Sequence, residues 1–373
     1  MKEDHSARLF TSHRLAHDSL VAMVERASDN AGLSPSAMIC LLDSPEPGLL
    51  DKLFAAARRQ RERHFGNAVF LYGFLYISTH CRNQCNFCFY RKNNSRAVRY
   101  RKTPPQIIQS TRLLAASGVH LIDLTAGEDP CLYDGDESAL DALVEMVHSI
   151  KADVALPVMA SIGAVPETVL NRLASAGTDW YACYQETHNR QLFEQLRVGQ
   201  SFEARYRCKV LAKAKGMLVE EGLLCGVGET SEDLIHSFDA MAHLSADQVR
   251  VMTFVPQLGT PMQDLLPSSS LRECITIALM RIAFPHLLIP ASLDVDGLAG
   301  LQQRLDAGAN VVTSLVPPGQ GLAGVAHSDL DIEDGRRTVE GITHTLRACG
   351  LVQATVRQYK DWIRQRKKHR QLS

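Results

Sequence analysis

The chain has 373 residues, of which 45% are hydrophobic and 22% are charged, and its 40 basic and 41 acidic side chains nearly cancel. This composition is typical of a globular protein with a large apolar core. A net charge of -1 provides no overall attraction to nucleic acid or to an anionic membrane. We therefore expect neither a nucleic-acid partner nor a membrane partner.

The first ten residues, MKEDHSARLF, lack the apolar segment of a signal peptide. No apolar run reaches the roughly 18 residues that suggest a membrane-spanning helix. These two features predict a cytoplasmic protein. In that compartment, ten cysteines indicate thiol chemistry or metal binding rather than a disulfide framework.

Residues 1–66 are predicted to form a helical extension, because 16–29 and 47–65 carry apolar residues at helical spacing. Residues 67–352 then alternate between short β-branched or aromatic runs and amphipathic segments. The runs predict eight strands, at 71–78, 119–124, 156–161, 179–184, 220–225, 249–254, 287–292 and 310–315. The amphipathic segments predict eight helices, at 105–117, 137–150, 166–176, 204–216, 231–244, 270–283, 297–307 and 333–349.

Strict alternation of strand and helix predicts an α/β protein with a parallel sheet, because a parallel connection must be long enough to hold a helix. Eight such units are the number that closes a (β/α)8 TIM-type barrel. An open doubly wound sheet is the alternative. Residues 353–373 are predicted to form a basic C-terminal tail, either as a solvated end or as a patch for a partner protein.

Three cysteines, Cys81, Cys85 and Cys88, stand in the loop that follows the first predicted strand. Barrel enzymes carry their chemistry at this end of the strands. Thiolates are the ligands that iron-sulfur clusters require, and three of them leave one iron of a 4Fe-4S cluster without a protein ligand. An open coordination position suits a metal that binds a small molecule. A zinc site completed by His64 or His80 is the alternative.

Polar residues also follow other predicted strands. Gly127 and Glu128 come after the second strand, and Glu186 comes after the fourth. Arg197 and Arg205 lie further along the chain, and a guanidinium group matches the geometry of a carboxylate. Either arginine is thus a candidate to bind an acidic ligand, and the alternative is a solvated charge on a helix.

Alternate side chains of a barrel strand face the lumen. Asp123 with Thr125, Arg250, and Ser292 with Asp294 are polar residues at such positions. A charge within an apolar strand is costly unless it is paired or functional. One interpretation is a structural ion pair of Arg250. The other is a pocket for a zwitterion, with one cation for a carboxylate and two anions for two ammonium groups.

The spacing C-x-x-x-C-x-aromatic-C, with Phe87 at the aromatic position, resembles the signature of the radical S-adenosylmethionine (radical SAM) superfamily. In this superfamily the amino and carboxylate groups of SAM bind the fourth iron. The turn Ala126-Gly127-Glu128 resembles its Gly-Gly-Glu motif, with Ala126 in place of the first glycine. The resemblance implies SAM contacts at Phe87, Gly127, Glu128, Ser161, Glu186, Arg197 and Arg205.

Further strings, spread over about residues 50–330, narrow the resemblance to the methylornithine synthases of pyrrolysine biosynthesis. They include Cys81-Arg82-Asn83-Gln84-Cys85, Val249-Arg250-Val251-Met252 and Ile289-Pro290-Ala291-Ser292-Leu293-Asp294. That family isomerises L-lysine to (3R)-3-methyl-D-ornithine, which implies a radical SAM mutase. Its amino-acid contacts would fall on Asp123, Arg250, Ser292 and Asp294, the set that strand parity also selects.

The resemblance also implies a mechanism. A low-potential donor such as a flavodoxin or ferredoxin reduces the cluster, SAM yields a 5'-deoxyadenosyl radical, and this radical abstracts hydrogen from lysine. Fragmentation and recombination then rebuild the carbon skeleton, so no catalytic side chain is expected beyond the cluster ligands. The alternatives are a radical SAM enzyme of the biotin synthase or hydrogenase-maturase type with a different amino-acid substrate, and a zinc-stabilised binding barrel without activity.

Overall fold

A computed structural model describes residues 17–27, 32–133, 137–318 and 336–372. Its centre is a sheet of parallel strands in the order β6-β5-β4-β3-β2-β1-β8-β7. They are β1 (Ala68–Ser78), β2 (Leu121–Ala126), β3 (Val158–Ser161), β4 (Trp180–Ala182), β5 (Leu218–Cys225), β6 (Gln248–Thr253), β7 (Pro290–Ser292) and β8 (Val311–Leu315). Each of the eight overlaps one predicted strand.

The sheet curves until its two edge strands meet. The Val249 backbone N–H of β6 donates to the Leu288 carbonyl, just before β7, at 3.0 Å. This contact nearly closes the ring, which confirms the (β/α)8 class and excludes an open doubly wound sheet.

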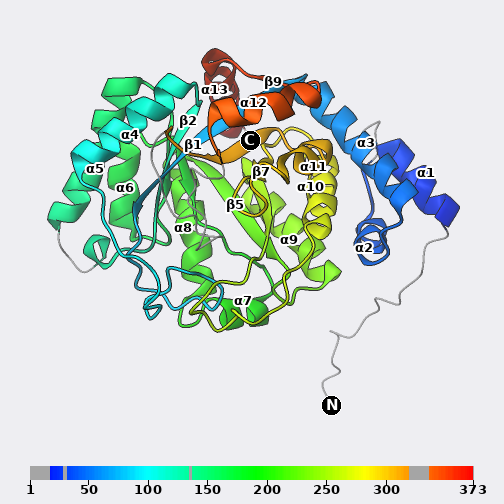
Figure 1. Ribbon diagram of the computed structural model, residues 1–373, viewed down its shortest axis with the longest axis horizontal. Helices are drawn as coiled ribbons and strands as arrows, with labels where there is room; N and C mark the ends of the chain where they lie inside the picture. Colours follow the sequence, from blue (N-terminus) through cyan, green and yellow to red (C-terminus); the bar gives the residue numbers. More distant parts are fainter. Residues whose placement is uncertain (1–16, 28–31, 134–136, 319–335, 373) are drawn as a thin grey trace.

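Helices surround the barrel (Figure 1). They are α4 (Pro104–Ser117), α5 (Glu137–Val154), α6 (Glu167–Ser175), α8 (Phe202–Ala214), α9 (Ser231–Leu244), α10 (Leu271–Ala283), α11 (Leu301–Asp306) and α12 (Val339–Ala348), with a 3-10 turn, η1 (Pro130–Leu132), before α5. Each matches a predicted helix, although residues 333–335 of the last prediction lie outside the described residues. The unpredicted α7 (Arg190–Leu196) is too short to show helical periodicity.

No helix in the described ranges is long and apolar enough to span a bilayer.

The N-terminal extension consists of α1 (His17–Ala27), α2 (Pro35–Asp43) and α3 (Pro47–Phe65). Helix α3 packs against α10, and α2 packs against α9 and α10. The Arg61 guanidinium of α3 also donates to the Ala309 carbonyl at 3.2 Å, just before β8. These helices therefore lie against the outer face of the barrel, with α3 beside α10 and α11 (Figure 1).

The C-terminal residues form a helix, α13 (Val356–Leu372), which covers the amino-terminal end of the barrel lumen. Tyr359 is fully buried there, and its hydroxyl donates to the Tyr72 hydroxyl at 2.7 Å. Trp362 stacks on Trp180, with ring centroids 5.9 Å apart. A short strand, β9 (Val352–Gln353), pairs with β1 and leads into this helix. The prediction of a solvated tail is therefore wrong for residues 353–372.

Two basic residues of α13 pair with carboxylates of the barrel. Arg366 pairs with Asp247, just before β6, at 2.8 Å. Lys367 pairs with Asp179, just before β4, at 3.4 Å. These basic residues of α13 thus pair with carboxylates at the amino ends of the strands. Their pairing could not be predicted because those carboxylates are distant in sequence.

We predict that Tyr359→Ala lowers the free energy of unfolding by roughly 3–5 kcal/mol, because it empties a buried aromatic site. Tyr359→Phe removes only the hydroxyl bond to Tyr72 and should cost about 1 kcal/mol. Exposed Lys368→Ala on the same helix is the control. Urea unfolding of the cluster-free protein measures all three, and equal effects of Tyr359→Ala and Lys368→Ala would contradict the role of α13 as a cover.

Candidate active site

The cysteine loop leaves the carboxyl end of β1 and is fixed by backbone hydrogen bonds to two neighbouring segments. The Arg82 N–H donates to the Glu128 carbonyl after β2 at 2.9 Å. The Asn86 N–H donates to the Leu196 carbonyl of α7 at 2.8 Å. The loop has no regular secondary structure, so these bonds set where its three thiols lie.

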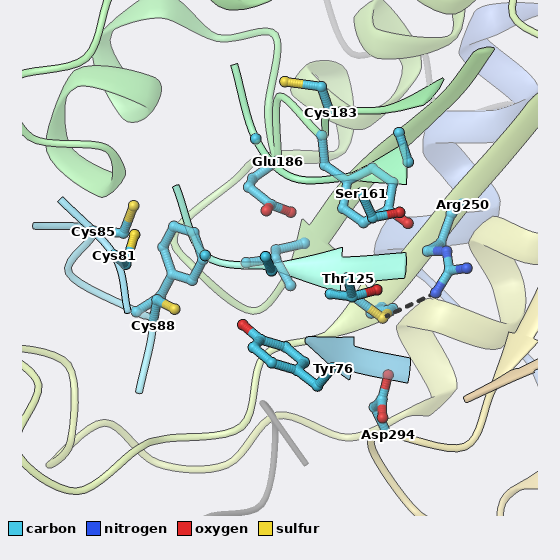
Figure 2. Close-up of a pocket in the computed structure, with 18 of the residues that line it drawn as sticks. Tyr76, Cys81, Cys85, Cys88, Thr125, Ser161, Cys183, Glu186, Arg250 and Asp294 are labelled. Carbon is cyan, nitrogen blue, oxygen red and sulfur yellow. Dashed lines mark hydrogen bonds between the residues drawn. The ribbon is translucent and has the colours of Figure 1, made fainter. Parts of the chain in front are cut away.

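A cavity of about 250 Å³ opens at the carboxyl ends of the strands. The three cysteines lie at one end of it, and Arg250 and Asp294 lie at the other (Figure 2). Its lining includes every predicted site residue except Ser292. One space therefore joins the predicted cluster site to the predicted amino-acid site.

At the cysteine end, polar side chains surround one sulfur. The Gln200 amide donates to the Cys85 Sγ at 3.0 Å, and an Arg197 Nη1 lies 3.6 Å from the same atom. Burial raises the pKa of Cys88, and the nearby thiols of Cys85 and Cys81 raise it further. Three anionic sulfurs in this space repel one another, and bound metal offsets that repulsion.

The donor set fits an iron-sulfur cluster. In a 4Fe-4S cluster each thiolate binds a different iron, so the sulfurs surround a space rather than a point. Within the described ranges, no three His, Cys, Asp or Glu side chains converge as ligands of a single metal ion. His64 lies at the far end of the 11-residue β1, about 35 Å of extended chain away, which removes it as a zinc ligand.

The Gly127-Glu128 turn lies directly against the cysteine loop. A Cβ atom at position 127 would lie 2.4 Å from the His80 carbonyl oxygen, so only glycine allows this approach. Glu128 is buried and accepts from the Arg205 guanidinium at 2.9 Å and from the Ala164 N–H at 2.9 Å. Burial raises the pKa of Glu128, but Arg205 and the Ala164 N–H outweigh it, and the pKa falls below its ordinary value.

Glu186 lies shortly after the end of β4, and its backbone has a left-handed conformation, with a φ of 69°. Its N–H donates to the Gly222 carbonyl at 3.0 Å, and its carbonyl accepts from the Leu224 N–H at 2.9 Å. Its carboxylate pairs with Arg197 at 2.6 Å. Burial raises the pKa of Glu186, and Arg197 and Arg205 offset this only in part.

Arg197 and Arg205 are both 6% exposed. Each donates to the Tyr184 carbonyl, at 3.1 Å and 2.6 Å respectively. The interpretation of either residue as a solvated helix charge is therefore wrong. Arg197 Nε and Thr313 Oγ1 are buried and without a hydrogen-bond partner in the part of the chain that is described, and both residues line the cavity. Such atoms are available to a ligand.

A buried ion pair, Lys209 with Glu221, supports the backbone next to Glu186. It was not predicted from the sequence. Lys209 and Glu221 are fully buried and pair with each other. The Glu221 carboxylate also accepts from the Gln185 N–H at 2.8 Å. Burial raises the pKa of Glu221, but Lys209 and His188 outweigh it and lower the pKa to about 2. This pair fixes the backbone beside the strained Glu186.

At the amino-acid end, Arg250 pairs through Nε with Glu220 at 2.6 Å. The Tyr184 hydroxyl donates to the other oxygen of Glu220 at 3.0 Å. Within the described residues, Nη2 of Arg250 has no hydrogen-bond partner, and Arg250 lines the cavity. Arg250 thus forms the structural ion pair, with Glu220, and also faces the cavity, where it could bind a carboxylate. Glu220 also lies at an alternate, lumen-facing position of its strand, so strand parity could have predicted it as it predicted Arg250.

Asp294 is held by three donors. The Arg337 guanidinium lies 2.9 Å from Oδ1, and the Ser314 and Ser292 hydroxyls lie 2.6 and 3.1 Å from Oδ2. Ser292 does not line the cavity, so its predicted direct contact with an amino acid is corrected to support of Asp294. Arg337 precedes α12 in an irregular segment, and no sequence pattern marks it.

Asp123 differs from the other carboxylates of the cavity. The Ser161 hydroxyl donates to it at 2.7 Å, but no lysine, arginine or histidine of the described residues forms an ion pair with it. Burial, reinforced by Glu220, raises the pKa of Asp123 to about 7, against the opposing effects of Ser161 and Arg250. Its charge therefore changes near neutral pH.

We predict a pH-dependent effect of Asp123→Asn on stability. The folded-state pKa of about 7 exceeds the unfolded value of 3.8, so the protonated form stabilises the fold below pH 4 and this contribution disappears as the pH rises to 7. The variant should therefore gain stability relative to the parent by up to about 1.4 kcal/mol per pH unit in that window, with no change above it. Urea unfolding between pH 5 and 8 measures it, with exposed Asp239→Asn as control. A constant difference would contradict the buried, raised pKa.

Comparison with known proteins places this geometry in a family. Residues 75–241 match the Radical SAM superfamily. The 3-methylornithine synthase of Methanosarcina acetivorans is 40% identical over 94% of this chain and 99% of its own length, and that of Methanosarcina barkeri is 39% identical over 91% and 95%.

Comparison with solved structures supports the same family. A crystal structure of methylornithine synthase (PylB) has a TM-score of 0.85 at 39% identity, covering 91% of this chain and 99% of its own. A crystal structure of HydG, a maturase of the [FeFe]-hydrogenase, shares the fold at 20% identity with a TM-score of 0.80, covering 96% of this chain and 81% of its own. The chain therefore belongs to the 3-methylornithine synthase family of the radical SAM superfamily, whose members use a 4Fe-4S cluster and SAM.

Proposed function

We propose that the protein isomerises L-lysine to (3R)-3-methyl-D-ornithine in pyrrolysine biosynthesis, with residues 67–352 as the catalytic barrel. The observation that carries the proposal is one cavity with three thiols at one end and Arg250 and Asp294 at the other (Figure 2), with Asp123 also in its lining. The 40% identity to a 3-methylornithine synthase over 94% of the chain supports it. We place the enzyme in the cytoplasm, where its thiols stay reduced.

We assign the cluster to Cys81, Cys85 and Cys88. When bound, the cluster and SAM supply the 5'-deoxyadenosyl radical that abstracts hydrogen from the substrate. The chain's own contribution is to hold the reactants in place and to exclude water. We assign the SAM contacts to Phe87, Gly127, Glu128, Ser161, Glu186, Arg197 and Arg205, all of which line the cavity. Ser161 in addition orients Asp123.

At the other end, we assign the substrate carboxylate to Arg250 and the two ammonium groups to Asp123 and Asp294. Glu220 fixes the direction of the Arg250 guanidinium, which reduces the entropy lost on binding. Ser292, Ser314 and Arg337 fix the Asp294 carboxylate in the same way. The aromatic side chains of Phe74 and Tyr76 also line the cavity, and their apolar faces help to exclude water from it.

Anaerobic incubation of the reconstituted, reduced protein with SAM and L-lysine tests the activity. We expect 5'-deoxyadenosine and a product that has the mass of lysine but a different retention time and fragmentation pattern. Formation of 5'-deoxyadenosine with unchanged lysine would retain the superfamily chemistry and contradict the substrate. L-Norleucine, which lacks the side-chain ammonium group, is the control substrate and should not be isomerised.

We predict that Arg250→Ala abolishes lysine turnover and also destabilises the fold by roughly 3–5 kcal/mol, because it leaves Glu220 buried without a cation. The double variant Arg250→Met/Glu220→Gln should regain most of that stability. Its specificity constant for lysine should still fall at least about 100-fold, because the carboxylate contact is gone. Steady-state kinetics with urea unfolding separates the two effects, and normal turnover by the double variant would remove Arg250 from the site.

We predict that lysine binding releases a proton from Asp123 below pH 7, because an ammonium group stabilises the ionised carboxylate. The affinity should rise by up to about tenfold per pH unit between pH 5 and 7 and level off above it. Calorimetry of the unreduced protein with SAM, in two buffers of different ionisation enthalpy, measures the proton count. Asp123→Asn should abolish the release, and Asp239→Asn should retain it. A parent protein that releases no proton would contradict the assignment of Asp123.

A further inference from the structure

The segment that contains the cysteine loop is strongly basic. Residues 81–102 contain seven Arg or Lys residues and no Asp or Glu, in a chain whose 40 basic and 41 acidic side chains nearly cancel overall. Four of the seven have internal roles: Arg82 and Arg101 pair with Glu128 and Asp129, Arg99 donates to backbone carbonyls, and Lys102 lies over the Tyr100 ring. Arg91, Lys92 and Arg96 have no acidic partner among the described residues. We call these three the basic patch.

The basic patch lies directly beside the cysteine loop. The Lys92 N–H donates to the Asn83 carbonyl at 2.7 Å, and an Arg91 Nη2 donates to the Gln84 carbonyl at 3.3 Å. Lys92 and Arg96 are exposed, and neither lines the cavity. Their charge is therefore directed at solvent next to the cluster site and does not serve the ligands inside the cavity.

Exposed apolar side chains accompany these charges. Val98 is 73% exposed, and its carbonyl accepts from the Thr79 hydroxyl at 2.9 Å, two residues before the first cysteine. Leu258 is 47% exposed, and Asn94 of the basic segment donates to its carbonyl at 2.8 Å. Two exposed acids lie nearby, Asp264 in the same loop as Leu258 and Glu194 on α7, next to Gln195, whose carbonyl accepts from the Asn86 amide. The three cations of the basic patch outnumber them. Apolar contacts with a charged rim are typical of a protein interface.

We infer that the basic patch, with Val98 and Leu258, docks a small acidic flavoprotein that delivers one electron from its reduced flavin. This inference rests on the proposed function, which requires a low-potential donor. Electron transfer needs close approach, and this surface adjoins the cysteine loop. Opposite charges steer such an encounter and speed association without demanding high affinity. In the transfer, the carrier loses one electron and the oxidised cluster gains it.

The test measures the rate at which the oxidised cluster of the reconstituted protein is reduced by a recombinant flavodoxin in its hydroquinone state. Stopped-flow absorbance under anaerobic conditions gives the second-order rate constant. The test variant is Lys92→Glu/Arg96→Glu, which leaves Arg91 in place because Arg91 holds the cysteine loop. The control is Arg207→Glu/Arg347→Glu, which reverses two exposed charges on α8 and α12. Dithionite serves as a small reductant for all three proteins.

At about 50 mM salt we expect the test variant to be reduced by flavodoxin at least tenfold more slowly than the parent, and the difference to shrink at about 500 mM salt. The control variant should stay within about twofold of the parent, since neither of its arginines belongs to the basic segment 81–102 or, within the described residues, forms a hydrogen bond or ion pair with the cysteine loop. Dithionite should reduce all three equally. Parental rates with flavodoxin in the test variant, or an equal loss in the control variant, would overturn the inference.

The dithionite arm separates this inference from the proposed function. If dithionite and SAM yield no 5'-deoxyadenosine in the parent, the proposed function fails. The flavodoxin rate constant still decides the docking surface in that case, because it reports electron arrival at the cluster directly.

Discussion

The cost of burying charge governs the whole carboxyl-terminal end of the barrel. Glu128, Glu186 and Asp294 are each at most 6% exposed, and each pairs with an equally buried arginine. A buried ion without a partner is expensive, so these pairs fix the side chains around the cavity before any ligand arrives. The arginines come from the helix α8, from the turn after α7 and from the segment before α12. The site is therefore ordered by contacts that span the chain.

The two ends of the barrel lumen differ in composition: the amino-terminal end is apolar and the carboxyl-terminal end is polar. Apolar side chains fill the amino-terminal end, and α13 covers them, with Tyr359 and Ile363 buried in the same cluster. The Tyr72 hydroxyl, which accepts from Tyr359, donates to Gln248 at 3.0 Å. Glu220 is level with Gln248 in the register of β5 and β6, and Arg250 lies two residues further along β6 and pairs with Glu220. A packed and covered lower half supports the polar upper half. Packed apolar side chains at the amino-terminal end thus support the polar residues in fixed positions.

Much of this could be predicted from sequence because the signals are local. Strand parity selected Asp123 and Arg250, and the cysteine spacing located the cluster loop. The partners of these residues were harder to find because they depend on packing between distant segments. Arg337 lies in an irregular stretch, and Lys209 stands in a helix whose pattern gives no sign of burial. The prediction of a solvated C-terminal tail was wrong for the same reason, because Asp247 and Asp179 become partners of α13 only after the barrel closes.

The pairing also bears on which amino acid the cavity selects. Asp294 already has the Arg337 cation, whereas Asp123 accepts from the Ser161 hydroxyl, has no ion-pair partner among the described residues, and stays partly protonated near pH 7. An ammonium group beside Asp123 would supply the charge that this carboxylate lacks. A ligand that lacks the ammonium group beside Asp123 would leave this carboxylate without an ion-pair partner, and an unpaired buried polar group penalises the wrong ligand more than a missing methylene does. On the proposed assignment, preference for a diamino acid follows from the charge balance of the cavity.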